Sequence, residues 1–70
     1  MNQQELEQKY QEIKDREKDI NDLSEEELRI LLAFEMWNDG MDWEDIQKIE
    51  HDSFWTVRNI ITYLQDVFGY

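Results

Sequence analysis

The sequence predicts an all-α fold in which an N-terminal amphipathic helix precedes a compact, helix-turn-helix-like unit of three helices. Proline is absent, the two glycines stand where helices would end, and apolar residues recur three or four positions apart. Seventy residues allow one modest core, because a chain this short buries only about 60% of the surface that it exposes when unfolded. We therefore expect residues 1–22 to form the amphipathic helix and residues 23–70 the three-helix unit.

The first helix is expected to run from Asn2 to about Ile20. Its apolar stripe consists of Leu6, Tyr10, Ile13 and Ile20, with Glu17 at the missing place in the series. A single helix of this length is marginal in water. The stripe must therefore pack on its own domain, on a second copy as a short coiled coil, or on a partner, and the sequence leaves all three open.

A capping box marks the start of the second helix, which we expect over Glu25 to about Asn38. Ser24 can accept a hydrogen bond from the amide of Glu27, whose carboxylate can accept one from the amide of Ser24. Gly40 is the expected left-handed residue at the end of this helix. The side chains expected to face inward are Leu28, Leu31, Leu32 and either Glu35 or Met36.

A similar start signal precedes the third helix, with Asp42 as N-cap, Asp45 at the third helical position and Met41 opposite Ile46. This helix is expected to be short and to end near Glu50. Ser53 is the expected N-cap of the last helix, which should end at Gly69. Its expected apolar face consists of Val57, Ile60, Ile61, Leu64 and Phe68.

Three segments together resemble a known DNA-binding unit. They are Leu23-Ser24-x-x-x-Leu28-x-x-Leu31, Gly40-Met41-x-Trp43-x-x-Ile46-x-x-Ile49 and Ser53-x-x-Thr56-Val57-Arg58-x-x-Ile61-x-x-Leu64. This arrangement resembles the helix-turn-helix of sigma-factor region 4 and related small transcriptional regulators. The resemblance implies that the last helix is a recognition helix with Val57, Ile61 and Leu64 as its buried face. It also implies groove-facing positions at Ser53, Phe54, Trp55, Arg58 and Asn59.

The sequence departs from that family where the family makes its tight turn. Gln47 stands where the family usually has a small residue, His51 where it has glycine, and Asp52 where it has an apolar residue. These departures indicate a wider turn before the last helix.

Charge argues against DNA as the partner. Eighteen acidic residues against seven basic ones leave a net charge of -11, which repels polyanions and favours basic partners. From Glu25 onward, three bases stand among eleven acids, whereas a specific DNA-binding protein commonly makes about 6 to 10 phosphate contacts through Lys and Arg.

We therefore expect a small acidic regulator or inhibitor, of phage or mobile-element type, that engages a basic nucleic-acid-binding protein such as a nuclease or polymerase. Mimicry of DNA is one form that this engagement could take. The alternative is a helix-turn-helix transcriptional regulator that binds DNA as a homodimer through its first helix.

Two sets of candidate partner-binding residues follow from these expectations. The acidic rows comprise Glu12, Asp15, Asp19 and Asp22 beside the first stripe, and Glu35, Asp39, Asp42, Glu44 and Asp45 further on. The recognition-helix face comprises Phe54, Trp55, Arg58, Asn59 and Thr62. Trp55 is either covered by the first helix or exposed as an anchor for a partner, since Trp is enriched in binding hot spots.

No enzymatic or cofactor chemistry is expected. His51, Asp52 and Ser53 contain the residue types of a hydrolase triad, but a triad is assembled in space rather than in sequence. One histidine and no cysteine argue against a transition-metal site. The longest apolar run, Ile30 to Phe34, is too short to span a bilayer, and the acidic N-terminus is unlike a signal peptide. A cytoplasmic location without a membrane partner is expected.

Four further aromatic residues are expected in the core or at its rim: Trp37, Trp43, Tyr63 and Tyr70.

Overall fold

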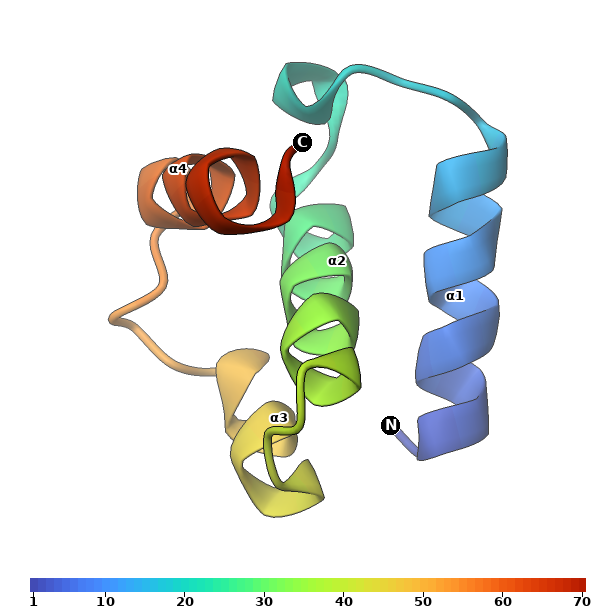
Figure 1. Ribbon diagram of the computed structural model, residues 1–70, viewed down its shortest axis with the longest axis vertical. Helices are drawn as coiled ribbons and strands as arrows, with labels where there is room; N and C mark the ends of the chain where they lie inside the picture. Colours follow the sequence, from blue (N-terminus) through green and yellow to red (C-terminus); the bar gives the residue numbers. More distant parts are fainter.

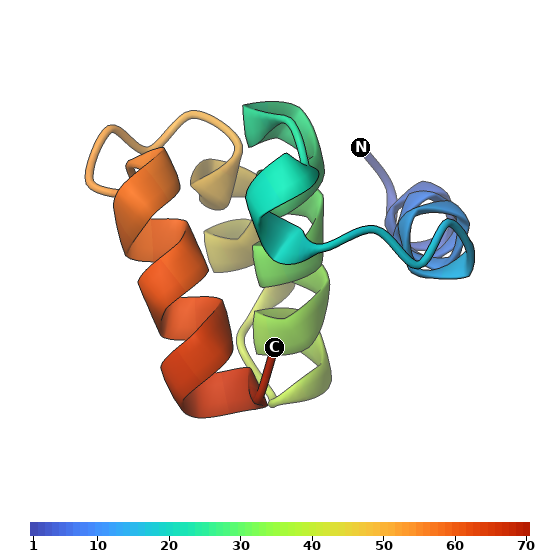
Figure 2. The ribbon, with the colours of Figure 1, turned by 90° about the horizontal axis from the view of Figure 1, so that it is seen from above.

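The computed structural model describes residues 1–70 and is helical without strands, which confirms the predicted all-α class (Figure 1). Its elements are α1 (Gln3–Asp15), a single 3-10 turn (Ile20–Asp22), α2 (Glu25–Asn38), α3 (Trp43–Ile49) and α4 (Val57–Phe68). The other three α-helices all pack against α2. Seen from above in Figure 2, α1 lies on one side of α2 and α4 on the other, so α2 is the centre of the molecule.

Helix α2 begins and ends as its sequence predicts. Ser24 Oγ accepts from the Glu27 amide at 3.2 Å, and Glu27 Oε1 accepts from the Ser24 amide at 2.9 Å. At the other end the amide of Met41 donates to the carbonyl of Met36 at 3.1 Å, and Gly40 has a φ of 106°. This left-handed glycine turns the chain away from α2 toward α3.

The core consists of thirteen apolar side chains, and no polar side chain is buried with them. Helix α2 supplies the expected Leu28, Leu31, Leu32 and Met36, together with Ile30 and Ala33. These additional buried positions arise because neighbours cover α2 from two sides, which a single-stripe pattern does not predict. The other elements contribute Leu6, Ile13, Ile20, Ile46, Ile49, Ile60 and Leu64.

The apolar stripe of α1 packs on its own chain. Leu6 and Ile13 are buried, and the ring of Tyr10 stacks on that of Phe34 at 3.8 Å between centroids. Of the three arrangements that the sequence left open, the structure therefore shows the intramolecular one. A homodimer through the same stripe would have to separate Leu6 and Ile13 from α2.

The first helix is shorter than expected, so the predicted boundary near Ile20 was wrong. Helix α1 ends at Asp15, and Glu17 adopts a left-handed φ of 52°. Ile20 still enters the core, but from the separate 3-10 turn, where Asp19 accepts from the amide of Asn21 at 2.9 Å. The break lets the chain cross from α1 to the start of α2 while Ile20 continues the apolar series.

Helix α3 ends by Glu50, as predicted, but its start differs in detail. Asp42 occupies the N-cap position, yet its side chain makes no capping hydrogen bond. Its backbone carbonyl instead accepts from the amides of Asp45 and Ile46 at 3.0 and 3.1 Å. Met41 is 36% exposed, so the expected staple between Met41 and Ile46 is not a buried contact.

The last helix starts later than predicted, and Ser53 is not its N-cap. Thr56 caps α4 by accepting from the amide of Asn59 at 3.2 Å, and Gly69 ends it with a φ of 76°. The resemblance implied Val57 as part of the buried face, but Val57 is 40% exposed at the first helical position. The buried residues of α4 are Ile60 and Leu64, with Ile61 half-buried beside them.

Candidate functional site

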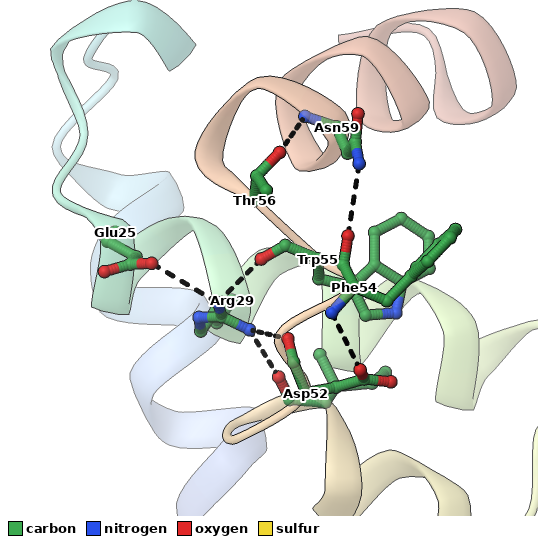
Figure 3. A network of polar contacts seen from close by, with 8 residues as sticks. Glu25, Arg29, Asp52, Phe54, Trp55, Thr56 and Asn59 are labelled. Carbon is green, nitrogen blue, oxygen red and sulfur yellow. Dashed lines mark hydrogen bonds and ion pairs between the residues drawn. The ribbon is translucent and has the colours of Figure 1, made fainter.

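One arginine holds the segment between α3 and α4, which we call the α3–α4 link (residues 50–56). Arg29 of α2 donates through Nη1 to the carbonyl of Ile49 at 2.7 Å and of Asp52 at 3.3 Å. Through Nη2 it donates to the carbonyl of Trp55 at 2.6 Å and to Glu25 Oε1 at 3.3 Å (Figure 3). The Arg29 side chain is only 14% exposed. Its guanidinium is therefore engaged in contacts within the molecule and is not available to a partner.

The α3–α4 link is wider than the three- or four-residue turn of a helix-turn-helix, as the departures at His51 and Asp52 led us to expect. Asp52 Oδ1 accepts from the amide of Phe54 at 2.9 Å, which is an Asx turn. The side-chain amide of Asn59 donates to the carbonyl of Phe54 at 3.1 Å. Side chains thus fix the link from both ends, and Figure 3 shows Phe54 and Trp55 between these contacts.

Phe54, rather than Trp55, is the exposed aromatic of this segment. Phe54 is 67% exposed, whereas Trp55 is half-buried with its ring edge-on to Phe54 and Tyr63, at 5.3 Å in each case. Helix α1 does not cover Trp55, because α1 lies beyond α2 from α4 (Figure 2). Both expectations for Trp55 were therefore incomplete. Helix α4, not α1, packs against the Trp55 ring, and only the exposed part of this ring can contact a partner.

The rest of the predicted recognition-helix face is exposed but carries little charge. Arg58, Asn59 and Thr62 are all exposed. The Asn59 amide is already used by the link, and Arg58 is the one base on α4. This face offers a single cation beside two exposed apolar side chains, Phe54 and Val57.

The acidic row predicted beside the first stripe is divided by the end of α1. Glu12 and Asp15 lie on the helix, while Asp19 caps the 3-10 turn and Asp22 ends it. All four residues are exposed, but the expectation of one continuous row at helical spacing was wrong, because the chain leaves the helix after Asp15.

The second acidic set gathers around the turn between α2 and α3. Asp39, Asp42, Glu44 and Asp45 are exposed there; we call these four residues the α2–α3 acidic turn. Asp45 has one partner, Lys48, at 3.7 Å. The remaining member of the predicted set, Glu35, is half-buried and serves a structural contact instead.

That structural contact joins both ends of the chain to α2. The Tyr70 hydroxyl donates to Glu35 Oε2 at 2.5 Å and lies 3.4 Å from the Tyr10 hydroxyl. Burial raises the pKa of Tyr70 far above its ordinary value, and the hydrogen bond to Glu35 acts in the same direction. Sequence reasoning treated Tyr70 only as a core or rim aromatic, since no local signal pairs it with a residue thirty-five positions away.

Most of the seven bases are engaged within the molecule. Four form ion pairs: Lys9 with Glu5, Arg16 with Glu27, Arg29 with Glu25, and Lys48 with Asp45. The ammonium of Lys14 lies 4.3 Å from the ring centroid of Tyr70. Lys18 and Arg58 are left without such a contact. The positive charge open to an incoming polyanion is therefore smaller than the composition suggests.

The structure groups no three His, Cys, Asp or Glu side chains in a way that could hold a metal ion. No helix has both the length and the apolar character needed to cross a bilayer. None of the protein-family models, curated proteins or solved structures matches this chain.

Proposed function

We propose that this chain is a small acidic regulator or inhibitor that binds a basic nucleic-acid-binding protein, such as a nuclease or a polymerase. The observation that carries the proposal is the imbalance of available charge. The net charge is -11, and Arg29, one of three bases after residue 24, is enclosed between α2 and the α3–α4 link. Only Arg58 remains there without a carboxylate partner.

Encounter with a basic partner would be driven by long-range attraction. A potential of one sign over a surface raises the association rate of an oppositely charged partner and repels a like-charged one. The α2–α3 acidic turn concentrates four exposed carboxylates on one end of the molecule. At physiological salt this attraction acts over about 8 Å, so additional contacts must supply specificity at closer range.

Phe54 is the best-placed residue for one such contact. It is exposed, and the link that carries it is fixed by Arg29, Asp52 and Asn59. An apolar side chain on a preorganised segment binds without a large loss of conformational freedom. Partner binding through charge and Phe54 requires no cofactor.

The proposal has three more specific elements: the chain mimics DNA, it comes from a phage or mobile element, and it acts in the cytoplasm. Successive helical turns rise about 5.4 Å, a spacing on the scale of backbone phosphates. The end of α1 at Asp15 limits this spacing argument to Glu12 and Asp15 in the first row, because the α2–α3 acidic turn lies at the ends of two helices and does not follow helical spacing. The inhibitor proposal does not depend on mimicry.

The test compares two kinds of probe over a range of salt concentrations. Fluorescent duplex DNA should show no binding at physiological salt, while a panel of purified nucleases and polymerases should contain a protein that is captured in a salt-sensitive manner. Lysozyme, which is basic but has no nucleic-acid channel, is the control for unspecific attraction. Replacing Asp39, Asp42 and Glu44 by their amides should weaken capture.

Two results would contradict the proposal. Tight binding to duplex DNA at physiological salt would favour the dimeric transcriptional regulator, with α4 as its recognition helix. Equal binding to lysozyme and to every nucleic-acid-binding protein would show unspecific attraction rather than regulation of a particular partner.

A further inference from the structure

A crevice of about 220 Å³ opens between α1, the first half of α2 and α3. Its apolar lining consists of buried side chains from all three helices together with the half-buried indole of Trp43 and the exposed side chain of Met1. The buried members are Leu6, Ile30, Ala33 and Ile46. Ligand pockets for drug-sized molecules usually measure about 300 to 1,000 Å³. The crevice is therefore of a size for one extended side chain rather than for a larger metabolite.

The mouth of this crevice is acidic. Glu25, Glu26 and Glu50 line it and are exposed. Glu25 forms an ion pair with Arg29 at 3.3 Å. The carboxylates of Glu26 and Glu50 have no hydrogen-bond or ion-pair partner in the structure. Arg29 is the one side-chain base among the lining residues, and its guanidinium is directed to the carbonyls of the α3–α4 link. Met1, which also lines the crevice, carries the α-ammonium group of the chain. Three carboxylates thus stand over an apolar floor against one engaged guanidinium and this α-ammonium group.

We propose that this crevice binds an arginine side chain of the basic partner. This inference rests on the proposed function. It identifies one short-range contact by which the chain would recognise the basic partner. The methylene stem of an arginine would lie on Leu6, Ile30 and the other apolar lining residues, as long charged side chains do on apolar surfaces. Its guanidinium would remain at the mouth, where it can donate to the free carboxylates of Glu26 and Glu50.

Charge and shape together select this occupant. An acidic side chain would be repelled by the mouth, and a neutral apolar one would cover two carboxylates without replacing their water. Lysine has a stem of similar length, but its ammonium is a point charge, whereas the planar guanidinium can donate to two carboxylates at once. The indole of Trp43 adds a further attraction for a guanidinium.

The experiment titrates the full chain with N-acetyl-arginine methylamide and follows amide and indole signals by NMR. The citrulline analogue has a stem of the same length without charge, and the lysine analogue keeps charge without the planar head. We expect arginine to shift signals of Ala33, Ile46 and the Trp43 indole, with smaller effects from lysine and none from citrulline.

Two double variants carry the same change of net charge. Glu26→Gln with Glu50→Gln removes the free carboxylates of the mouth, whereas Glu7→Gln with Glu17→Gln removes two exposed carboxylates that do not line the crevice. The first variant should raise the Kd for the arginine probe by roughly 2- to 30-fold, the range that follows from two partly exposed ion pairs. The second should change it by less than about twofold. Circular dichroism should show the same helix content in both.

Several results would overturn the crevice assignment. Shifts spread evenly over all acidic residues, equal weakening by the two variants, or a lysine or citrulline analogue that binds as tightly as arginine would each do so. None of these results depends on the capture of a protein partner. Conversely, a chain that binds duplex DNA and captures no basic protein would refute the proposed function, whatever the arginine titration shows.

Discussion

The contact between Arg29 and the α3–α4 link makes a prediction about stability. Arg29→Met keeps an apolar stem of similar size but removes every donor. The carbonyls of Ile49 and Trp55 would lose hydrogen bonds of 2.7 and 2.6 Å, and those of Asp52 and Glu25 would lose longer ones. The link would then be held by the aromatic contacts of Trp55 and by the hydrogen bond from the Asn59 side chain to the carbonyl of Phe54.

The expected loss follows from the two short contacts. A hydrogen bond that involves a charged group contributes about 1.5 to 3 kcal/mol, and carbonyls that can regain water lie toward the lower value, so the two together contribute about 3 kcal/mol. A chain of this size has a free energy of unfolding of roughly 4 to 10 kcal/mol. The substitution should therefore remove about 30% or more of the stability and lower Tm by about 12 to 24 °C.

Urea and thermal unfolding followed by far-UV circular dichroism would measure this loss, because the helical signal does not depend on the surroundings of Trp55. Arg58→Met is the matched control, since Arg58 is exposed and forms no ion pair; it should change stability by less than about 0.5 kcal/mol. Arg29→Lys should fall between the two, because a single ammonium cannot reach all the carbonyls in the geometry of a guanidinium. If Arg29→Met destabilises the protein no more than Arg58→Met does, Arg29 does not stabilise the link in this way.

The remaining predictions concern a cap, a turn and two apolar positions. The pKa of Glu27 is lowered, first of all by the backbone hydrogen bond from Ser24, so its carboxylate stabilises the fold above the unfolded pKa of 4.5 and this contribution disappears as the pH falls through the folded value. Glu27→Gln should therefore be less stable than the parent at pH 7, with a difference that shrinks on acidification at constant ionic strength; a constant difference would contradict this. Gly40→Ala places a Cβ at a φ of 106° and should cost about 1 to 2 kcal/mol in urea unfolding. Leu64→Ala should cost about 2 to 5 kcal/mol, whereas Phe54→Ser should cost less than about 0.5 kcal/mol and yet weaken capture of a basic partner.

The parts of the fold that could be predicted depend on neighbours within about one helical turn. The capping box of Ser24 and Glu27 joins residues three apart, and the left-handed residues Gly40 and Gly69 act on the turn just before them. Periodicity likewise predicted the buried residues Leu28 and Leu31, because side chains three or four apart share a face.

The predictions that were wrong depend on contacts between distant residues. Both Ser53 and Thr56 can cap a helix, and sequence alone does not choose between them. Arg29 holds the carbonyl of Trp55, twenty-six positions away, so the link continues to Thr56 before α4 can begin. The end of α1 before Glu17 is a similar case, because it depends on where Ile20 must enter the core.

For the candidate site, too, some properties follow from the sequence and others only from contacts between distant residues. Composition by itself determined that the chain is strongly negative, and local signals determined that it is helical with marked ends, since both properties are sums over residues or over single turns. Only the tertiary structure decided that Arg29 is engaged, that Phe54 rather than Trp55 is exposed, and that Glu26 and Glu50 stand at one crevice. These outcomes depend on which side chains from different helices contact one another. The energy of such a tertiary contact involves at least two segments, so it cannot be calculated from one segment alone.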